Sequence, residues 1–262
     1  MRLVAFAQSE DVRIHYDLAG PTAAPVIVFS NSLGENFSMW ETQIPEFQKQ
    51  FRVLRYDTRG HGQSSVTPGP YTIEQLARDV LTLLDELQFN RVYFCGLSMG
   101  GQIGMWLALN APDRLQKLVL CNTAAKIGTP EMWNARIEAV RKGGMKSVSD
   151  AVIGRWFSAD YRAKCSDKVD KIQRTFETTD PEGYIGNCYA LREFDAREAI
   201  AAIHVPALVI AGTHDAATTP ADGRYLASNI PGARYVELNA AHLSNIEDST
   251  RFNAEVSTFL LS

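Results

Sequence analysis

The alternation of apolar and polar positions divides the chain into short apolar runs and longer amphipathic segments. The continuous apolar runs at residues 26–30 and 92–95 are typical of strands buried on both faces of a parallel sheet. Residues 72–87 place apolar side chains three and four positions apart, which predicts a helix with one buried face. Strand-like and helix-like segments alternate along much of the chain. This order predicts an α/β protein with a mostly parallel, twisted sheet flanked by helices.

Further strand-like runs complete the predicted sheet. The first two, at residues 2–7 and 12–18, favour an antiparallel pair at one edge of the sheet. A helix is expected from about residue 39 to residue 47. The remaining strand-like runs are residues 51–56, 117–121, 204–211 and 234–238.

The alternation stops between residues 129 and 194, where the pattern is helical throughout. Because strand-like sequence resumes afterwards, this block is interpreted as a helical cap (lid) inserted into the sheet domain. We therefore expect a core of residues 1–124 and 196–262, a cap of residues 125–195, and a pocket between them. The expected cap helices lie within residues 130–143, 147–157, 167–177 and 182–194.

Composition limits the partners and the setting of the protein. The 262 residues are 45% apolar and 21% charged, which is ordinary for a globular protein with a sizeable core. A net charge of -4 without a basic stripe argues against a nucleic-acid partner. No apolar run is long enough for a membrane span, and the N-terminal stretch lacks the apolar core of a signal peptide. The cysteines are not spaced as metal ligands, so we expect a reduced, cytoplasmic protein without metal or disulfide.

The strand at residues 92–95 leads into a glycine-rich turn and then a buried helix. The turn reads Gly96-Leu97-Ser98-Met99-Gly100, the G-x-S-x-G pattern of a nucleophile elbow. Glycine lets the two backbones pass closely, while the turn lifts the Ser98 hydroxyl clear of the sheet. The strand, the helix and a third glycine, Gly101, disfavour the alternative of a glycine-rich turn that holds a serine by chance. The stretch resembles the nucleophile elbow of α/β-hydrolases.

A serine nucleophile needs a general base, and the base needs an orienting acid. Asp215 and His242 each follow a predicted strand, so both lie at the carboxyl edge of the sheet, where active sites of open α/β sheets gather. They also follow the serine in the order that α/β-hydrolases use. We therefore expect Ser98, Asp215 and His242 to form a catalytic triad.

Three other residues compete for the roles of base and acid. His61 lies in a D-x-R-G-x-G-x-S run at residues 57–64, and a structural role in this glycine-rich loop is favoured. His214 is adjacent to Asp215, and neighbouring side chains generally diverge. Asp195, near the end of the cap, is the weaker candidate for the acid.

The expected oxyanion hole consists of two backbone donors. The turn places the Met99 N–H at a helix N-terminus, where it can stabilise a developing oxyanion. In α/β-hydrolases the loop after the strand at residues 26–30 supplies the second N–H, which by position belongs to Leu33. Many of these proteins carry His-Gly where this chain has Asn31-Ser32. That departure leaves the backbone donor in place.

Longer stretches are similar to the 3-oxoadipate enol-lactonase family in particular, and they cover nearly the whole chain. They read FSNSLGENFSMW, YDTRGHGQS, GLSMGG, PEMWNARIEAVRKGGM, RWFSADY, NCYALREFDAREAI and VPALVIAGTHDAATTP. The resemblance implies that Ser98, Asp215 and His242 hydrolyse an enol-lactone to 3-oxoadipate, in bacterial degradation of aromatic compounds by the β-ketoadipate pathway. It also implies that the reaction needs no cofactor and no metal.

The lactone that the resemblance implies carries a free carboxylate, and its recognition calls for arginines or backbone donors near the site. Trp133, Arg136 and Arg192 of the cap are the expected substrate contacts. Arg155, beside Trp156, is a further candidate in the cap and serves as the control for Arg136 and Arg192. For each of these arginines the alternative is a side chain that faces solvent.

Two other kinds of function are compatible with the same residues. A promiscuous carboxylesterase or cofactor-free perhydrolase would share the triad and differ in the cap and in carboxylate recognition. A non-catalytic ligand-binding protein on this fold belongs to a different class, and the intact set of Ser98, Asp215 and His242 disfavours it. The sequence does not determine the oligomeric state.

Overall fold

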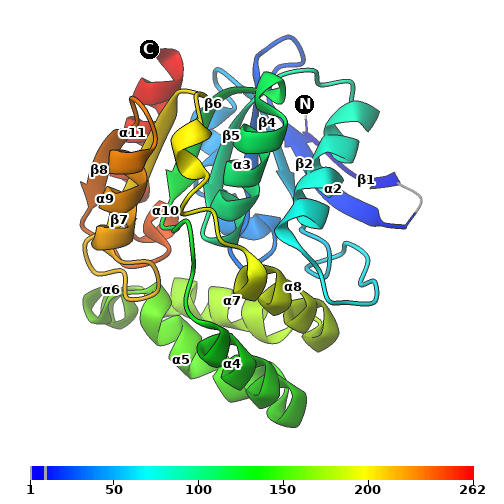
Figure 1. Cartoon of the computed structure of the whole chain (residues 1–262), viewed down its shortest axis with the longest axis vertical. Coiled ribbons are helices and arrows are strands. Elements are labelled where there is room, and N and C mark those ends of the chain that lie inside the picture. Colours follow the sequence, from blue (N-terminus) through cyan, green and yellow to red (C-terminus); the bar gives the residue numbers. More distant parts are fainter. Residues whose placement is uncertain (1, 9–10) are drawn as a thin grey trace.

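One twisted sheet forms the centre of the molecule (Figure 1). The structure is a computed structural model and describes residues 2–8 and 11–262. Within these residues the sheet has eight strands in the order β1-β2-β4-β3-β5-β6-β7-β8. β1–β2 and β2–β4 are antiparallel and the other neighbours are parallel, which confirms the predicted sheet and its antiparallel edge. The strands are β1 (Arg2–Gln8), β2 (Arg13–Ala19), β3 (Val26–Ser30), β4 (Arg52–Tyr56), β5 (Val92–Leu97), β6 (Leu115–Cys121), β7 (Ala207–Gly212) and β8 (Arg234–Leu238).

Helices cover both faces of the sheet. Successive side chains of a strand point to opposite faces, so the apolar runs of the central strands have apolar side chains to bury on each face. Phe94 of β5 faces α3, where it lies against Gly104. Phe29 of β3 lies opposite Cys95, the residue after Phe94, so its ring points to the other face of the sheet. There it stacks on Trp40 (ring centroids 4.7 Å apart) and packs edge-on against Phe47 of α1 (5.3 Å). The core helices are α1 (Ile44–Phe47), α2 (Ile73–Glu86), α3 (Met99–Asn110), α9 (Pro220–Asn229), α10 (Ser244–Glu247) and α11 (Ser249–Leu261), with 3₁₀ turns η1 (Phe37–Trp40), η2 (Pro112–Arg114) and η3 (Ile200–Ala202).

A separate layer of helices lies beyond one end of the sheet (Figure 1). In the described part of the chain these helices follow one another between β6 and β7, and no strand interrupts them. The four expected helices are confirmed, and α6 is an additional short one. The bounds of the core and of the cap, with the cap at residues 125–195, remain our proposal. The helices are α4 (Pro130–Gly143), α5 (Lys146–Trp156), α6 (Ala159–Lys164), α7 (Ser166–Glu177) and α8 (Pro181–Glu193).

The helical layer is fastened to the loop that follows β8. The Leu243 N–H donates to the carbonyl oxygen of Trp156, at the end of α5, over 3.0 Å. The Glu247 carboxylate accepts hydrogen bonds from the hydroxyl and the N–H of Ser158, and from the Ala241 N–H at 3.1 Å. The start of α6 and the loop after β8 therefore form one hydrogen-bonded unit.

The segment before α1 differs from the single helix expected between residues 39 and 47. The structure has the 3₁₀ turn η1 and then the short helix α1. Pro45 lies in the first turn of α1, and it has no N–H with which to continue a helix from η1. The buried indole of Trp40 donates to Asn31 Oδ1 over 2.9 Å, so η1 is fixed beneath the loop that follows β3.

A buried ion pair holds the loop after β4 against α2. Arg59, only 2% exposed, donates to both carboxylate oxygens of Asp79 at 2.8 and 2.6 Å. Its remaining donors reach Asp11 at 2.8 Å and Thr67 at 3.0 Å. Burial raises the pKa of Asp79, although the hydrogen bonds from Arg59 oppose the shift. The guanidinium thus depends on Asp79 as its buried counter-charge.

Replacement of Asp79 by alanine should lower the free energy of unfolding by about 3–5 kcal/mol, because the Arg59 charge would stay buried without its main partner. Denaturant unfolding of the full chain measures this loss. Arg78→Ala is the matched control on the neighbouring residue. It removes an exposed pair with Glu74 and a contact of the guanidinium with the Trp106 ring, 5.6 Å from its centroid, and it should change stability by about 1 kcal/mol or less. Equal losses in the two variants would contradict the importance of the buried pair.

Candidate active site

Ser98 lies at the sharp turn between β5 and α3, and its backbone is strained. Its φ of +57° is in the left-handed region, which is uncommon for a residue with a side chain. A Cβ on Gly96 would lie 2.1 Å from the Gly100 carbonyl oxygen, and one on Gly100 would lie 2.3 Å from that of Ser30. Only glycine fits at these two positions, so the G-x-S-x-G pattern has a direct steric cause.

Asp215 and His242 meet at the carboxyl edge of the sheet, after β7 and β8. His242 Nδ1 and Asp215 Oδ2 are 2.8 Å apart. Burial by itself would raise the pKa of Asp215, but the charge and hydrogen bond of His242 and the Thr218 N–H outweigh it, so the pKa is lowered. The carboxylate is therefore ionised and suited to orient the imidazole. The second ring nitrogen of His242 is left for chemistry in the cavity.

Asn122 is a member of this cluster that the sequence reasoning did not single out. Its side-chain amide donates to Asp215 Oδ2 at 3.0 Å and to the carbonyl oxygen of Ala241 at 3.2 Å. Its own oxygen accepts from the Ser244 hydroxyl at 2.6 Å. Asn122 directly follows β6, so the strand-edge argument that found Asp215 applies to it as well. It ties the acid to the loop that carries His242.

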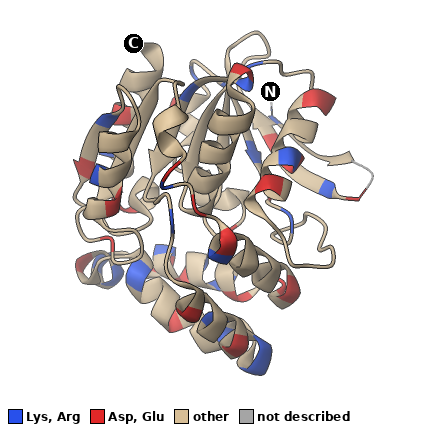
Figure 2. Ribbon diagram, in the orientation of Figure 1, with Lys and Arg blue, Asp and Glu red and all other residues tan. Residues whose placement is uncertain are grey.

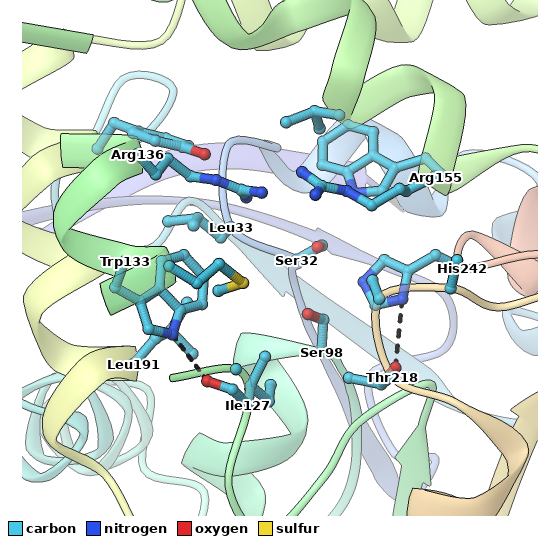
Figure 3. A pocket seen from close by; sticks show the side chains of 17 residues that line it. Ser32, Leu33, Ser98, Ile127, Trp133, Arg136, Arg155, Leu191, Thr218 and His242 are labelled. Carbon is cyan, nitrogen blue, oxygen red and sulfur yellow. Dashed lines mark hydrogen bonds between the residues drawn. The ribbon is translucent and has the colours of Figure 1, made fainter. Parts of the chain in front are cut away.

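One cavity joins the core to the helical layer above it. Figure 3 shows the Ser98 hydroxyl and the His242 ring facing this cavity from the core side, with Arg136 and Arg155 across from them. Indole and aliphatic side chains form much of the remaining wall. The lining residues are Ser32, Leu33, Ser98, Ile127, Gly128, Met132, Trp133, Arg136, Val152, Arg155, Trp156, Tyr184, Leu191, Ala216, Ala217, Thr218 and His242.

Two backbone donors lie beside Ser98. Met99 is the first residue of α3, so its N–H has no acceptor within the helix. The Leu33 N–H makes no hydrogen bond within residues 2–8 and 11–262, and Leu33 lines the cavity. The N–H of Ser32, in contrast, is directed to Met39 Sδ at 3.4 Å. The arrangement supports Leu33 and Met99 as the donors of an oxyanion hole.

Two arginines of the helical layer line the cavity. The Arg136 guanidinium lies over the Trp133 ring, 5.3 Å from its centroid, and the Trp133 indole is fixed by a 2.7 Å hydrogen bond to Ile127 O. Burial lowers the pKa of Arg155, and the nearby charge of Arg136 lowers it further. None of the ion pairs found among the described residues involves either arginine. The cavity therefore concentrates positive charge that is suited to an anion.

Arg192, a predicted substrate contact, does not line this cavity. It donates to Asn134 Oδ1 and to Glu193 Oε1, both at 2.6 Å, and its guanidinium lies over the Tyr189 ring. In the last turn of α8 the Arg192 side chain is therefore directed at Asn134, Tyr189 and Glu193 and away from the cavity. Arg155, which the sequence analysis used as the control, lines the cavity, whereas Arg192 does not.

The rival bases and the rival acid also lie outside the cavity lining. His61 Nε2 accepts a hydrogen bond from the Gly34 N–H at 2.8 Å. His214 is exposed, with Nε2 3.0 Å from Asn239 Oδ1. Asp195 is paired with Arg197.

The sheet order, the strained serine between β5 and α3, and an acid and a histidine after β7 and β8 are the architecture of an α/β-hydrolase. A sequence model of the family described as the alpha/beta hydrolase fold matches residues 25–182. The chain therefore belongs to the α/β-hydrolase family.

Three relatives narrow this class. The chain is 43% identical to 3-oxoadipate enol-lactonase 2 of Acinetobacter baylyi, over 95% of this chain and 93% of the relative. It is 41% identical to 3-oxoadipate enol-lactonase 1 of the same organism, over 93% of this chain and 91% of the relative. The crystal structure of the enol-lactonase from Burkholderia xenovorans LB400 matches with a TM-score of 0.97 and 51% identity, over 98% of this chain and all (100%) of that one. The expected resemblance to the enol-lactonases is confirmed.

Among residues 2–8 and 11–262, no helix is long and apolar enough to cross a bilayer. In the same part of the chain, no three His, Cys, Asp or Glu side chains gather as metal ligands would. Figure 2 shows Lys and Arg interspersed with Asp and Glu along the helices, as on an ordinary solvated surface.

Asp215→Asn tests the orientation of His242. The amide keeps the shape of the side chain but favours the wrong tautomer of the imidazole. As for the same change in a serine protease, kcat should fall by roughly four orders of magnitude. Steady-state kinetics with p-nitrophenyl acetate measure the effect. Asp195→Asn is the matched control, and near-normal turnover by a folded Asp215→Asn variant would reject Asp215 as the acid.

Proposed function

We propose that this protein hydrolyses the enol-lactone of 3-oxoadipate to 3-oxoadipate, within bacterial breakdown of aromatic compounds by the β-ketoadipate pathway. The observation that carries the proposal is a single cavity with Ser98 and His242 on one side and two cap arginines on the other. The resemblance to two 3-oxoadipate enol-lactonases, at 43% and 41% identity, supports the same substrate. A cytoplasmic location and the absence of a nucleic-acid partner remain predictions from the sequence.

In the first half of the proposed reaction the lactone acylates the serine. Ser98 Oγ attacks the lactone carbonyl carbon while His242, oriented by Asp215, takes the hydroxyl proton. The Leu33 and Met99 N–H groups hold the oxyanion of the tetrahedral intermediate. The ring C–O bond then breaks, and its electron pair leaves on the ring oxygen as an enolate. Resonance stabilises this leaving group, so it needs little help from an acid.

The second half releases the product. The enolate remains attached to the acyl chain, takes up the proton held by His242 and becomes a ketone. His242 then removes a proton from water, and the resulting hydroxide attacks the acyl carbon in the same oxyanion hole. The Ser98–acyl bond breaks and Ser98 Oγ regains a proton from His242. The net reaction adds one water and requires no further reactant.

The free carboxylate of the lactone is proposed to bind the cap arginines. A guanidinium offers paired N–H donors that match a carboxylate, and Arg136 and Arg155 both line the cavity. Trp133 holds the Arg136 side chain from below and supplies an apolar wall. We therefore keep Trp133 and Arg136 as proposed contacts and replace Arg192 by Arg155.

Ser98→Ala should abolish most turnover of the enol-lactone, followed by ultraviolet absorbance, while the fold and substrate binding remain. In the serine-protease case the loss of the nucleophile costs up to about a million-fold in kcat. Assays of the wild-type protein with the enol-lactone and with p-nitrophenyl acetate distinguish an enol-lactonase from a general esterase. Turnover of the ester without the lactone would favour a general esterase, and a folded Ser98→Ala variant with normal activity would reject the triad.

Removal of a carboxylate contact should affect the charged lactone selectively. A hydrogen bond to a charged group is worth about 1.5–3 kcal/mol, so Arg136→Ala or Arg155→Ala should lower kcat/KM for the lactone by roughly one to two orders of magnitude. Hydrolysis of uncharged p-nitrophenyl acetate should barely change. Arg192→Ala is the matched control because its side chain lies outside the cavity. A selective loss in Arg192→Ala alone would return the anchor to that residue.

A further inference from the structure

The loop that carries the Leu33 donor is a tight turn whose shape depends on Gly34. The Glu35 N–H donates to the Ser32 carbonyl oxygen over 3.2 Å, which closes a four-residue turn from Ser32 to Glu35. Gly34, the third residue, has a φ of +86°. A value of about +80° at this position defines a type II turn and normally requires glycine. The Leu33 N–H thus belongs to the first peptide of a type II turn.

Two peptide planes flank Leu33, and each is held by a different hydrogen bond. The Ser32–Leu33 peptide is fixed through its carbonyl oxygen by the Glu35 N–H, which leaves the Leu33 N–H pointing the opposite way. The Leu33–Gly34 peptide is the central peptide of the turn, and its N–H donates to His61 Nε2 over 2.8 Å. The closing hydrogen bond is common to type I and type II turns, so it does not choose between them. The contact with His61 holds the central peptide in its type II orientation.

The next peptide is held from the cap. The Thr179 hydroxyl donates to the Gly34 carbonyl oxygen over 3.0 Å. The ring of Phe176 lies so close to Gly34 that a Cβ there would be 2.5 Å from it. Gly34 is therefore bonded through both its N–H and its C=O, and its free side is covered by an aromatic ring.

His61 is built to accept this hydrogen bond rather than to exchange protons. It is fully enclosed, and burial lowers its pKa to about 4, so near neutral pH the ring is uncharged and Nε2 keeps its lone pair. With Nε2 as acceptor, Nδ1 carries the proton and faces the Arg59 carbonyl oxygen at 3.4 Å. The Asn187 side chain of α8 donates to the same carbonyl at 2.9 Å and to Gly183 O at 2.8 Å. The Gly34 N–H and the Arg59 carbonyl oxygen fix the direction of the ring, and Asn187 holds that carbonyl in place.

We infer that His61 is a positioning residue of the oxyanion hole, which locks the turn from Ser32 to Glu35 so that the Leu33 N–H points at the reacting carbonyl. The inference rests on the proposed function of Leu33 as an oxyanion donor. It gives a role in the reaction to the D-x-R-G-x-G-x-S loop, which lies between β4 and α2 and does not line the cavity. His61 acts through Gly34 and never touches substrate.

The kinetic signature follows from where the donor acts. A donor aimed at the oxyanion stabilises the transition state more than bound substrate, so its misplacement lowers kcat and leaves KM nearly unchanged. A donor displaced by about 1 Å costs on the order of a hundredfold. The carbonyl is common to lactones and open esters, so the loss should be the same for the enol-lactone and for p-nitrophenyl acetate.

Three substitutions of His61 separate its acceptor from its bulk. His61→Phe keeps the ring and removes the acceptor, and it should lower kcat about tenfold to hundredfold for both substrates. His61→Gln places an oxygen near the position of Nε2 and should recover most of the loss. His61→Asn carries the same amide on a shorter side chain, cannot reach the Gly34 N–H, and should resemble His61→Phe. Circular dichroism and thermal unfolding confirm that the compared proteins are folded.

His15→Phe is the matched control, because His15 is a second buried histidine, bonded to Asp57 at 2.7 Å and outside the cavity. It should lower stability while kcat of the folded protein stays unchanged. Equal kcat in folded His61→Phe and wild type, or equal activity of His61→Gln and His61→Asn below wild type, would overturn the inference. Failure of the wild type on the lactone alone would reject the proposed substrate instead, since p-nitrophenyl acetate still tests His61.

Discussion

The close approach of β5, α3 and β3 at the elbow is the constraint on which the rest of the site depends. Gly96 and Gly100 allow this approach, and the Gly100 N–H donates to the Asn31 carbonyl oxygen over 3.0 Å. The Thr123 hydroxyl holds the Ser98 carbonyl oxygen at 2.7 Å. The strain at Ser98 is thus opposed by bonds to the loops that directly follow β3 and β6. The Gly100–Asn31 bond also sets the distance between Ser98 and the loop that carries Leu33.

The parts of the site that the sequence could predict are those set by local geometry. A G-x-S-x-G turn between an apolar strand and a helix has one steric solution, so Ser98 and Met99 follow from a few neighbouring residues. Asp215 and His242 follow from a rule of similar strength, because carboxyl ends of parallel strands share one edge. The structure brings these residues together, with His242 Nδ1 2.8 Å from Asp215. The positions of the strands along the chain and the helical block between β6 and β7 could likewise be predicted from periodicity, whereas the order of the strands in the sheet was not predicted.

The parts that could not be predicted depend on how helices are rolled and on contacts between distant segments. Arg136, Arg155 and Arg192 look alike in the sequence, and only the packing of α4, α5 and α8 sends the first two into the cavity. The position of Asn122 after β6 places it at the same edge of the sheet, but the sequence does not indicate that its partner is Asp215, 93 positions later. The partner of His61 is Gly34, a backbone group, and side-chain patterns carry no signal for such a bond.

The helical layer is one uninterrupted stretch of chain between β6 and β7, whereas the reacting groups lie in loops outside it. In the proposed function, the arginines that bind the substrate carboxylate and the residues that break the ester bond therefore lie in different segments of the chain. Another helical layer could replace this one without a change in the residues of the proposed triad. Among the contacts that such a replacement has to keep are two side-chain hydrogen bonds to the core. The Ser158 hydroxyl donates to Glu247, which follows the loop that carries His242. The Thr179 hydroxyl donates to the Gly34 carbonyl oxygen in the turn from Ser32 to Glu35. A replacement layer without these two side chains would change the substrate selectivity, but it would also leave the loops that carry His242 and Leu33 less firmly held.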